Sequence, residues 1–99
     1  MTFDLGLTSR DLDTVTAIFR KYPGIERVRV FGSRAKGNHR RGSDIDLAVE
    51  GKYEMFRLRD DFEESSLPYL IDIIDPRTCT SNDLREHIDR VGKVVYERK

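Results

Sequence analysis

Two aspartates flank one isoleucine in the segment Asp44-Ile45-Asp46, and this spacing could bring two carboxylates to one site. The alternation of Ile45, Leu47 and Val49 with polar residues predicts a β-strand whose apolar side faces a core. Residues i and i+2 of a strand share a face, so both aspartates should point away from that core. Adjacent carboxylates repel each other unless a cation lies between them, and magnesium favours carboxylate oxygens together with substrate phosphates. The pair therefore predicts a magnesium site.

A third aspartate, Asp72, interrupts the apolar segment YLIDIID at residues 69–75, which predicts a strand buried on both faces. A carboxylate in such a strand is costly unless it is paired or binds a metal. Alternation puts Asp72 and Asp75 on opposite faces, so only one of them can join the first pair. We choose Asp72, because Asp75 precedes Pro76 and has the position of a turn residue at the end of the strand.

The loop before the aspartate pair carries groups that suit a phosphate. Gly32 follows a predicted strand at Ile25–Phe31 and lets the backbone approach a ligand closely. Ser33 offers a hydroxyl and an amide at the start of a predicted helical turn, where helix dipoles favour anions. The loop lacks the lysine and hydroxyl that complete a P-loop. Loop cations such as Arg34 and Lys36 would replace that lysine, and the aspartates would supply the magnesium ligands.

Several features of this region also have simpler interpretations. A Gly-Ser turn before a charged hairpin could be only a turn, and the joint occurrence with the aspartates is what argues against this. For Arg40 and Arg41, a solvated basic turn and a triphosphate contact are equally consistent with the sequence. His39 is more typical of an exposed loop residue than of a proton shuttle, and His87 is expected at the surface of a helix.

Alternating helices and strands must position these groups. The short loop from Gly32 to Ser43 must return the second strand beside the first, so the sheet should be mixed, with helices packed on its one apolar face. We predict a single α/β domain over residues 1–99. Its expected elements are helix 8–22, strand 25–31, helical turn 34–37, strand 44–50, helix 52–65, strand 69–75, helix 81–91 and strand 93–97.

Composition restricts the class of protein. The 99 residues suffice for one small domain, and 18 basic against 18 acidic residues argue against a protein that grips nucleic acid by bulk charge. Cys79 is the only cysteine, which excludes an intramolecular disulfide and a zinc-ligand pattern. The sequence has no apolar run long enough to span a membrane and no signal-peptide pattern at its start. We therefore expect a cytoplasmic protein.

Gly32-Ser33, ten residues and then Asp44-Ile45-Asp46 resemble the G-S-x10-D-x-D signature of the DNA polymerase beta-like nucleotidyltransferase superfamily. The resemblance covers most of the chain and is nearest to the minimal nucleotidyltransferases, the antitoxin partners of HEPN-domain toxins. The other matching segments are F-G-S-R-A-x-G, S-D-I-D-L, L-P-Y-L-I-D and I-x-x-x-G-x-x-x-Y. The resemblance implies the polymerase beta-like fold, nucleotide triphosphate bound at Gly32 and Ser33, and two magnesium ions bound by Asp44, Asp46 and Asp72.

The same resemblance implies an enzyme that moves a nucleoside monophosphate, most simply AMP from ATP, onto a hydroxyl and releases pyrophosphate. The acceptor would be a tyrosine of a HEPN-domain partner chain. The alternative is a nucleotide-binding partner subunit that neutralises or regulates a second protein through complex formation without catalysis. A chain of 99 residues has no further domain to hold an acceptor, so both alternatives predict a separate protein partner.

Overall fold

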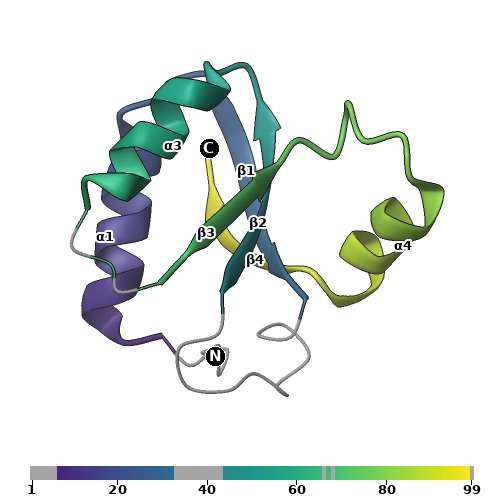
Figure 1. Ribbon diagram of the computed structural model, residues 1–99, viewed down its shortest axis with the longest axis horizontal. Helices are drawn as coiled ribbons and strands as arrows, with labels where there is room; N and C mark the ends of the chain where they lie inside the picture. Colours follow the sequence, from purple (N-terminus) through teal and green to yellow (C-terminus); the bar gives the residue numbers. More distant parts are fainter. Residues whose placement is uncertain (1–6, 33–43, 66, 68, 99) are drawn as a thin grey trace.

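The protein was analysed as a computed structural model, which describes residues 7–32, 44–65, 67 and 69–98. The described strands form one sheet in the order β3-β2-β1-β4 (Figure 1). β1 runs antiparallel to β2 and β4, whereas β2 runs parallel to β3, so the sheet is mixed, as predicted. The elements are α1 (Ser9–Arg20), β1 (Ile25–Phe31), β2 (Ile45–Gly51), α3 (Met55–Glu63), β3 (Ile71–Ile74), α4 (Asn82–Val91) and β4 (Lys93–Glu97).

The helix ends follow from local side-chain chemistry. The Thr8 hydroxyl accepts a hydrogen bond from the Asp11 amide, while the Asp11 carboxylate accepts one from the Thr8 amide, which forms a capping box at the start of α1. The Ser81 hydroxyl caps α4 by accepting from the amide of Leu84. The bounds of β1 and β4 match the predicted strands at 25–31 and 93–97. The predicted helical turn at 34–37 lies outside the described residues.

The main core lies between the sheet and the two helices α1 and α3. Val15 and Phe19 of α1 and Leu58 of α3 are fully or nearly fully buried against Val28 and Leu47 of the central strands. Figure 1 shows α1 and α3 on one side of the sheet and α4 on the other. The expectation that helices pack on one apolar face therefore holds for α1 and α3 only.

A second apolar patch on the opposite face explains the position of α4. Ile88 of α4 is fully buried and packs against Phe31 of β1 and Ala48 of β2. These strand residues alternate with the main-core residues, so the sheet offers apolar contacts on both faces. The α4 face is also the face on which the aspartates of β2 and β3 lie, which brings α4 to the candidate site.

β3 is an edge strand, and the prediction that residues 69–75 form a strand buried on both faces was wrong. It pairs with β2 on one side, is four residues long, and buries Ile73 in the main core. Asp72 is exposed on the opposite face. The aspartate therefore carries no large burial cost, and a carboxylate at an exposed edge needs no partner to be tolerated.

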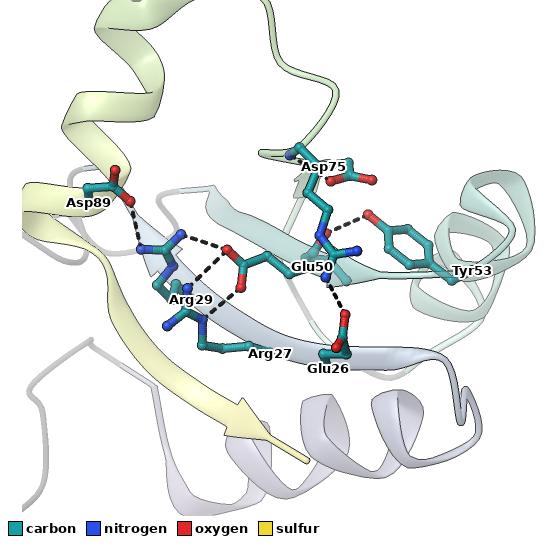
Figure 2. A network of polar contacts seen from close by, with 9 residues as sticks. Glu26, Arg27, Arg29, Glu50, Tyr53, Asp75 and Asp89 are labelled. Atoms are coloured by element: carbon teal, nitrogen blue, oxygen red, sulfur yellow. Dashed lines mark hydrogen bonds and ion pairs between the residues drawn. The ribbon is translucent and has the colours of Figure 1, made fainter. Parts of the chain in front are cut away.

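On the α4 face, Arg29 of β1 is buried in a network of charged side chains (Figure 2). Its guanidinium donates to Glu50 of β2 at 3.0 Å and to Asp89 of α4 at 3.1 Å, and Arg27 donates to Glu50 at 2.7 Å. The hydrogen bond from Arg27 lowers the pKa of Glu50, and the charges of Arg27, Arg29 and Arg77 add to this lowering against the opposing effect of burial. Glu50 of β2 thus binds Arg29 of β1, and Arg29 in turn binds Asp89 of α4.

Replacing Glu50 with glutamine should destabilise the fold by about 2 kcal/mol at pH 7, because charge-assisted hydrogen bonds to Glu50 are lost. Arg29 then keeps Asp89 as its one anionic partner. The lowered pKa of Glu50 means that this contribution is present above its usual pKa and is lost as the pH falls through the lowered value. Urea unfolding of parent and variant from neutral to acidic pH measures the difference. Glu63→Gln, at an exposed position of α3, is the control. A difference that persists unchanged in acid would contradict this role.

In the described part of the chain, no helix has the length and apolarity needed to cross a membrane. The cytoplasmic location stays a prediction.

Candidate active site

The ends of three neighbouring strands bring the candidate site together. In the antiparallel register of β1 and β2, Phe31 lies opposite Asp46. In the parallel register of β2 and β3, Asp46 lies opposite Asp72. Asp46 is thus flanked on one side by the residue that precedes Gly32 and on the other by Asp72. Asp44 directly precedes β2 and is exposed.

The charges of Asp72 and Asp44 act on the carboxylate of Asp46. Partial burial raises the pKa of Asp46, and the negative charges of Asp72 and then Asp44 raise it further. The nearby His87 acts in the opposite direction and lowers it. The structure therefore brings together the three aspartates that the sequence predicts. It adds His87, which was expected at the surface of a helix.

Gly32 lies against the carboxylate of Asp46. Its φ is +77°, in the left-handed region that favours glycine. A Cβ atom built on Gly32 would lie 2.4 Å from Oδ2 of Asp46 and 3.4 Å from Cγ, so no side chain fits without displacing the carboxylate. The close contact of Gly32 in the described residues is with Asp46, and its predicted approach to a phosphate ligand stays a prediction.

His87 was missed as a site residue, and the expectation that it lies at the helix surface was wrong. It is partly buried, its Nε2 accepts a hydrogen bond from the Gly32 amide at 3.3 Å, and its ring meets that of Phe31 edge to face with centroids 6.1 Å apart. A signal was present in the sequence. His87 shares the helical stripe of Leu84, Ile88 and Val91, which was correctly predicted to face inwards.

Asp75 does not join the site, as predicted. It follows β3, and its carboxylate accepts a hydrogen bond from the amide of Arg77 while its carbonyl accepts one from Thr78, which is the geometry of a turn. The predicted nucleotide contacts Ser33, Arg34 and Lys36 lie outside the described residues, together with His39, Arg40 and Arg41. Their roles stay predictions.

The three aspartates are the candidate ligands for magnesium. Across residues 7–32, 44–65, 67 and 69–98, no group of three His, Cys, Asp or Glu side chains is arranged so that it could hold a metal ion by itself. Magnesium does not need such a cage, because it commonly uses one or two carboxylates together with water and substrate phosphates. Burial and then the charges of Asp72 and Asp44 raise the pKa of Asp46, and a divalent cation would stabilise this group of carboxylates. The residues fit the ion in their chemistry.

Replacing Asp46 with asparagine should raise the free energy of unfolding at pH 7 when no metal is present. Folding raises the pKa of Asp46, so the ionised carboxylate destabilises the folded state. This cost is absent below the usual pKa of the group, grows as the pH rises from that value towards the raised pKa, and is complete above the raised pKa. Urea unfolding of the parent and the variant at neutral and acidic pH measures it, with Asp60→Asn on the exposed side of α3 as control. A variant that is less stable than the parent at pH 7 would contradict the predicted repulsion.

Comparison with known proteins shows which family and which relatives the chain is similar to. The family described as "Polymerase beta, Nucleotidyltransferase" matches residues 13–99. The "Probable protein adenylyltransferase MntA" of Haemophilus influenzae is 36% identical over 100 aligned residues, which cover 96% of this chain and 87% of that protein.

Two solved structures share the fold. One is a crystal structure of a toxin-antitoxin with AMP-PNP, at a TM-score of 0.73 and 24% identity, covering 90% of this chain and 75% of that one. The other is a complex of the tri-AMPylated HEPN toxin of Shewanella oneidensis with its MNT antitoxin, at a TM-score of 0.65 and 22% identity, covering 88% of this chain and 70% of that one. At these identities the likeness concerns the fold, which matches the polymerase beta-like architecture predicted from the sequence.

Proposed function

The chain belongs to the polymerase beta nucleotidyltransferase family, and on this premise we propose that it transfers AMP from ATP to a hydroxyl group of a partner protein. The observation that carries the proposal is the register of the three strands. It places Asp46 between the Gly32 end of β1 and Asp72 of β3, with Asp44 one step before β2. Carboxylates next to a glycine whose position leaves no room for a side chain suit a site for magnesium and phosphate.

Each residue has a distinct part in the proposed reaction. Asp44 and Asp46 would hold the magnesium ion that accompanies the triphosphate, and Asp72 would add the ligand for a second ion. The bound ions would stabilise the attacking and leaving oxygens of an in-line displacement. Gly32 lets the end of β1 lie against the Asp46 carboxylate, where a side chain would displace it. Ser33, Arg34 and Lys36 would contact the triphosphate, as the family resemblance implies.

The proposed transfer is a displacement at phosphorus. The acceptor hydroxyl oxygen attacks the α-phosphorus of ATP, the bond between that phosphorus and the bridging oxygen to the β-phosphate breaks, and pyrophosphate leaves. The hydroxyl proton must go to a base, and the exposed carboxylate of Asp72 on the edge strand is accessible to an incoming acceptor. Exposure of Asp72 is consistent with an acceptor that belongs to a second, large molecule.

A HEPN-domain protein is the partner that we propose, with a tyrosine hydroxyl as the acceptor. The relative at 36% identity is named for protein adenylyltransfer, and the two solved structures described above are toxin-antitoxin complexes. The fold itself supports a separate acceptor, because the described elements form a single sheet with its helices. In this role the chain would act as the antitoxin of the pair.

Transfer of a labelled phosphate from ATP to the partner tests the proposal. The chain, magnesium and a HEPN-domain partner are incubated with ATP labelled either at the α-phosphate or at the γ-phosphate. We expect label in the partner only from α-labelled ATP, with release of pyrophosphate and no transfer when magnesium is chelated. Label from γ-labelled ATP would identify a kinase, and no label from either would refute nucleotidyl transfer to this class of partner.

A further inference from the structure

Helix α4 reaches the candidate site through one side chain. Its buried residue Ile88 is flanked by two polar anchors on the same sheet face, the hydrogen bond between His87 and Gly32 and the ion pair between Asp89 and Arg29. The second anchor holds the helix to the charged network of β1 and β2. The first anchor contacts the residue that begins the predicted phosphate-binding loop.

The contact with Gly32 sets which nitrogen of the neutral imidazole accepts the hydrogen bond. Nε2 of His87 accepts the proton of the Gly32 amide, so this nitrogen carries a lone pair and the proton of the neutral ring lies on Nδ1. The edge-to-face contact with Phe31 holds the ring plane in place. A side chain with an acceptor at the same distance from the backbone could replace this contact, whereas an apolar side chain could not.

Gly32 needs such a contact because glycine is the residue least restricted by its own backbone. A φ of +77° is one of several values that glycine can adopt. Contacts with neighbouring residues must therefore select the conformation in which Gly32 lies against Asp46 without displacing its carboxylate. The β1–β2 register holds Phe31 on one side of Gly32. The amide of Gly32 is held from the other side of the site by α4, through His87.

We propose that His87 is a positioning residue, which holds the Gly32 amide and thereby sets the start of the phosphate-binding loop against Asp46. The part of this inference that concerns binding of the triphosphate rests on the proposed function. His87 would act on binding of the triphosphate more than on the chemical step, because its contact is to the loop and not to the reacting atoms. A change at His87 should therefore affect KM more than kcat.

Three variants separate the histidine contact from the docking of the helix. His87→Gln keeps an acceptor at the position of Nε2, His87→Leu removes the acceptor but fills a similar volume, and Asp89→Asn weakens the other anchor of α4 without touching Gly32. The first readout is the hydrogen-exchange rate of the Gly32 amide, measured by NMR on the free protein. The second is KM and kcat for magnesium-ATP.

We expect His87→Leu to accelerate exchange of the Gly32 amide and to raise KM, each by roughly tenfold, with a smaller change in kcat. His87→Gln should stay near the parent, and so should Asp89→Asn at the Gly32 amide. Equal effects of the glutamine and leucine variants, an unchanged Gly32 amide in His87→Leu, or the same acceleration in Asp89→Asn would each overturn the proposal. If the parent chain does not turn over ATP, the proposed function fails, and the amide exchange still decides whether His87 positions Gly32.

Discussion

Replacing Gly32 with valine should reduce nucleotidyl transfer by at least about a hundredfold, which is the scale of loss when a reacting group is displaced by about 1 Å. The first side-chain carbon would lie 2.4 Å from Oδ2 of Asp46, so the carboxylate would have to move. The φ of +77° adds backbone strain for a β-branched residue. A displaced Asp46 carboxylate could no longer hold the magnesium ion that we place there.

Turnover with α-labelled ATP measures this loss, and circular dichroism shows whether the variant is folded. The comparison variant is Ser33→Ala, which would remove one phosphate-side donor worth about 1 kcal/mol and so should cost far less than Gly32→Val. If both variants transferred AMP at the parent rate, the Gly-Ser segment would be an ordinary turn and the proposed phosphate site would be wrong.

Replacing Asp72 with asparagine should reduce transfer by about a thousandfold while it leaves folding and most of the magnesium-ATP affinity intact. The change is nearly isosteric, and the position is exposed on an edge strand, so little packing is lost. Asp44 and Asp46 remain to hold the ion that travels with the triphosphate. What is lost is the ligand for the second ion and the carboxylate that could take the hydroxyl proton.

Calorimetry with magnesium-ATP and single-turnover transfer separate these two effects of Asp72→Asn. Asp75→Asn is the matched control, because it makes the same chemical change three residues later, in the turn that follows β3. Transfer by Asp72→Asn at the rate of the Asp75→Asn control would remove Asp72 from the reaction. A complete loss of magnesium-ATP binding would instead assign Asp72 to ground-state binding.

Local patterns in the sequence were enough to predict most of the fold. Period-two alternation and strong caps predicted β1, β4, α1 and α4 closely, because these signals depend on residues that are near one another in the chain. The same alternation placed Asp44 and Asp46 on one sheet face, and the position of Asp75 before Pro76 favoured Asp72 as the third carboxylate. The Asp46–Asp72 register agrees with that choice. The mixed sheet followed from the shortness of the connection between β1 and β2.

The features that were missed depend on which elements become neighbours. β3 looked buried because Ile71, Ile73 and Ile74 crowd a short segment, yet it forms an edge because no further strand pairs with it in the described part of the chain. The contact of α4 with Arg29 through Asp89 joins residues sixty positions apart and has no local signal. His87 looked like a surface residue because the face of the sheet on which α4 packs was not foreseen.

The intact mass of a HEPN-domain partner, purified after co-expression with this chain or with its Asp72→Asn variant, tests nucleotidyl transfer most directly. We predict that the partner carries AMP when it is co-expressed with the parent chain. With Asp72→Asn it should carry none and remain toxic, even though the two proteins still form a complex. An unmodified partner that is neutralised equally well by both forms would contradict the enzymatic function and would show that complex formation alone carries the effect.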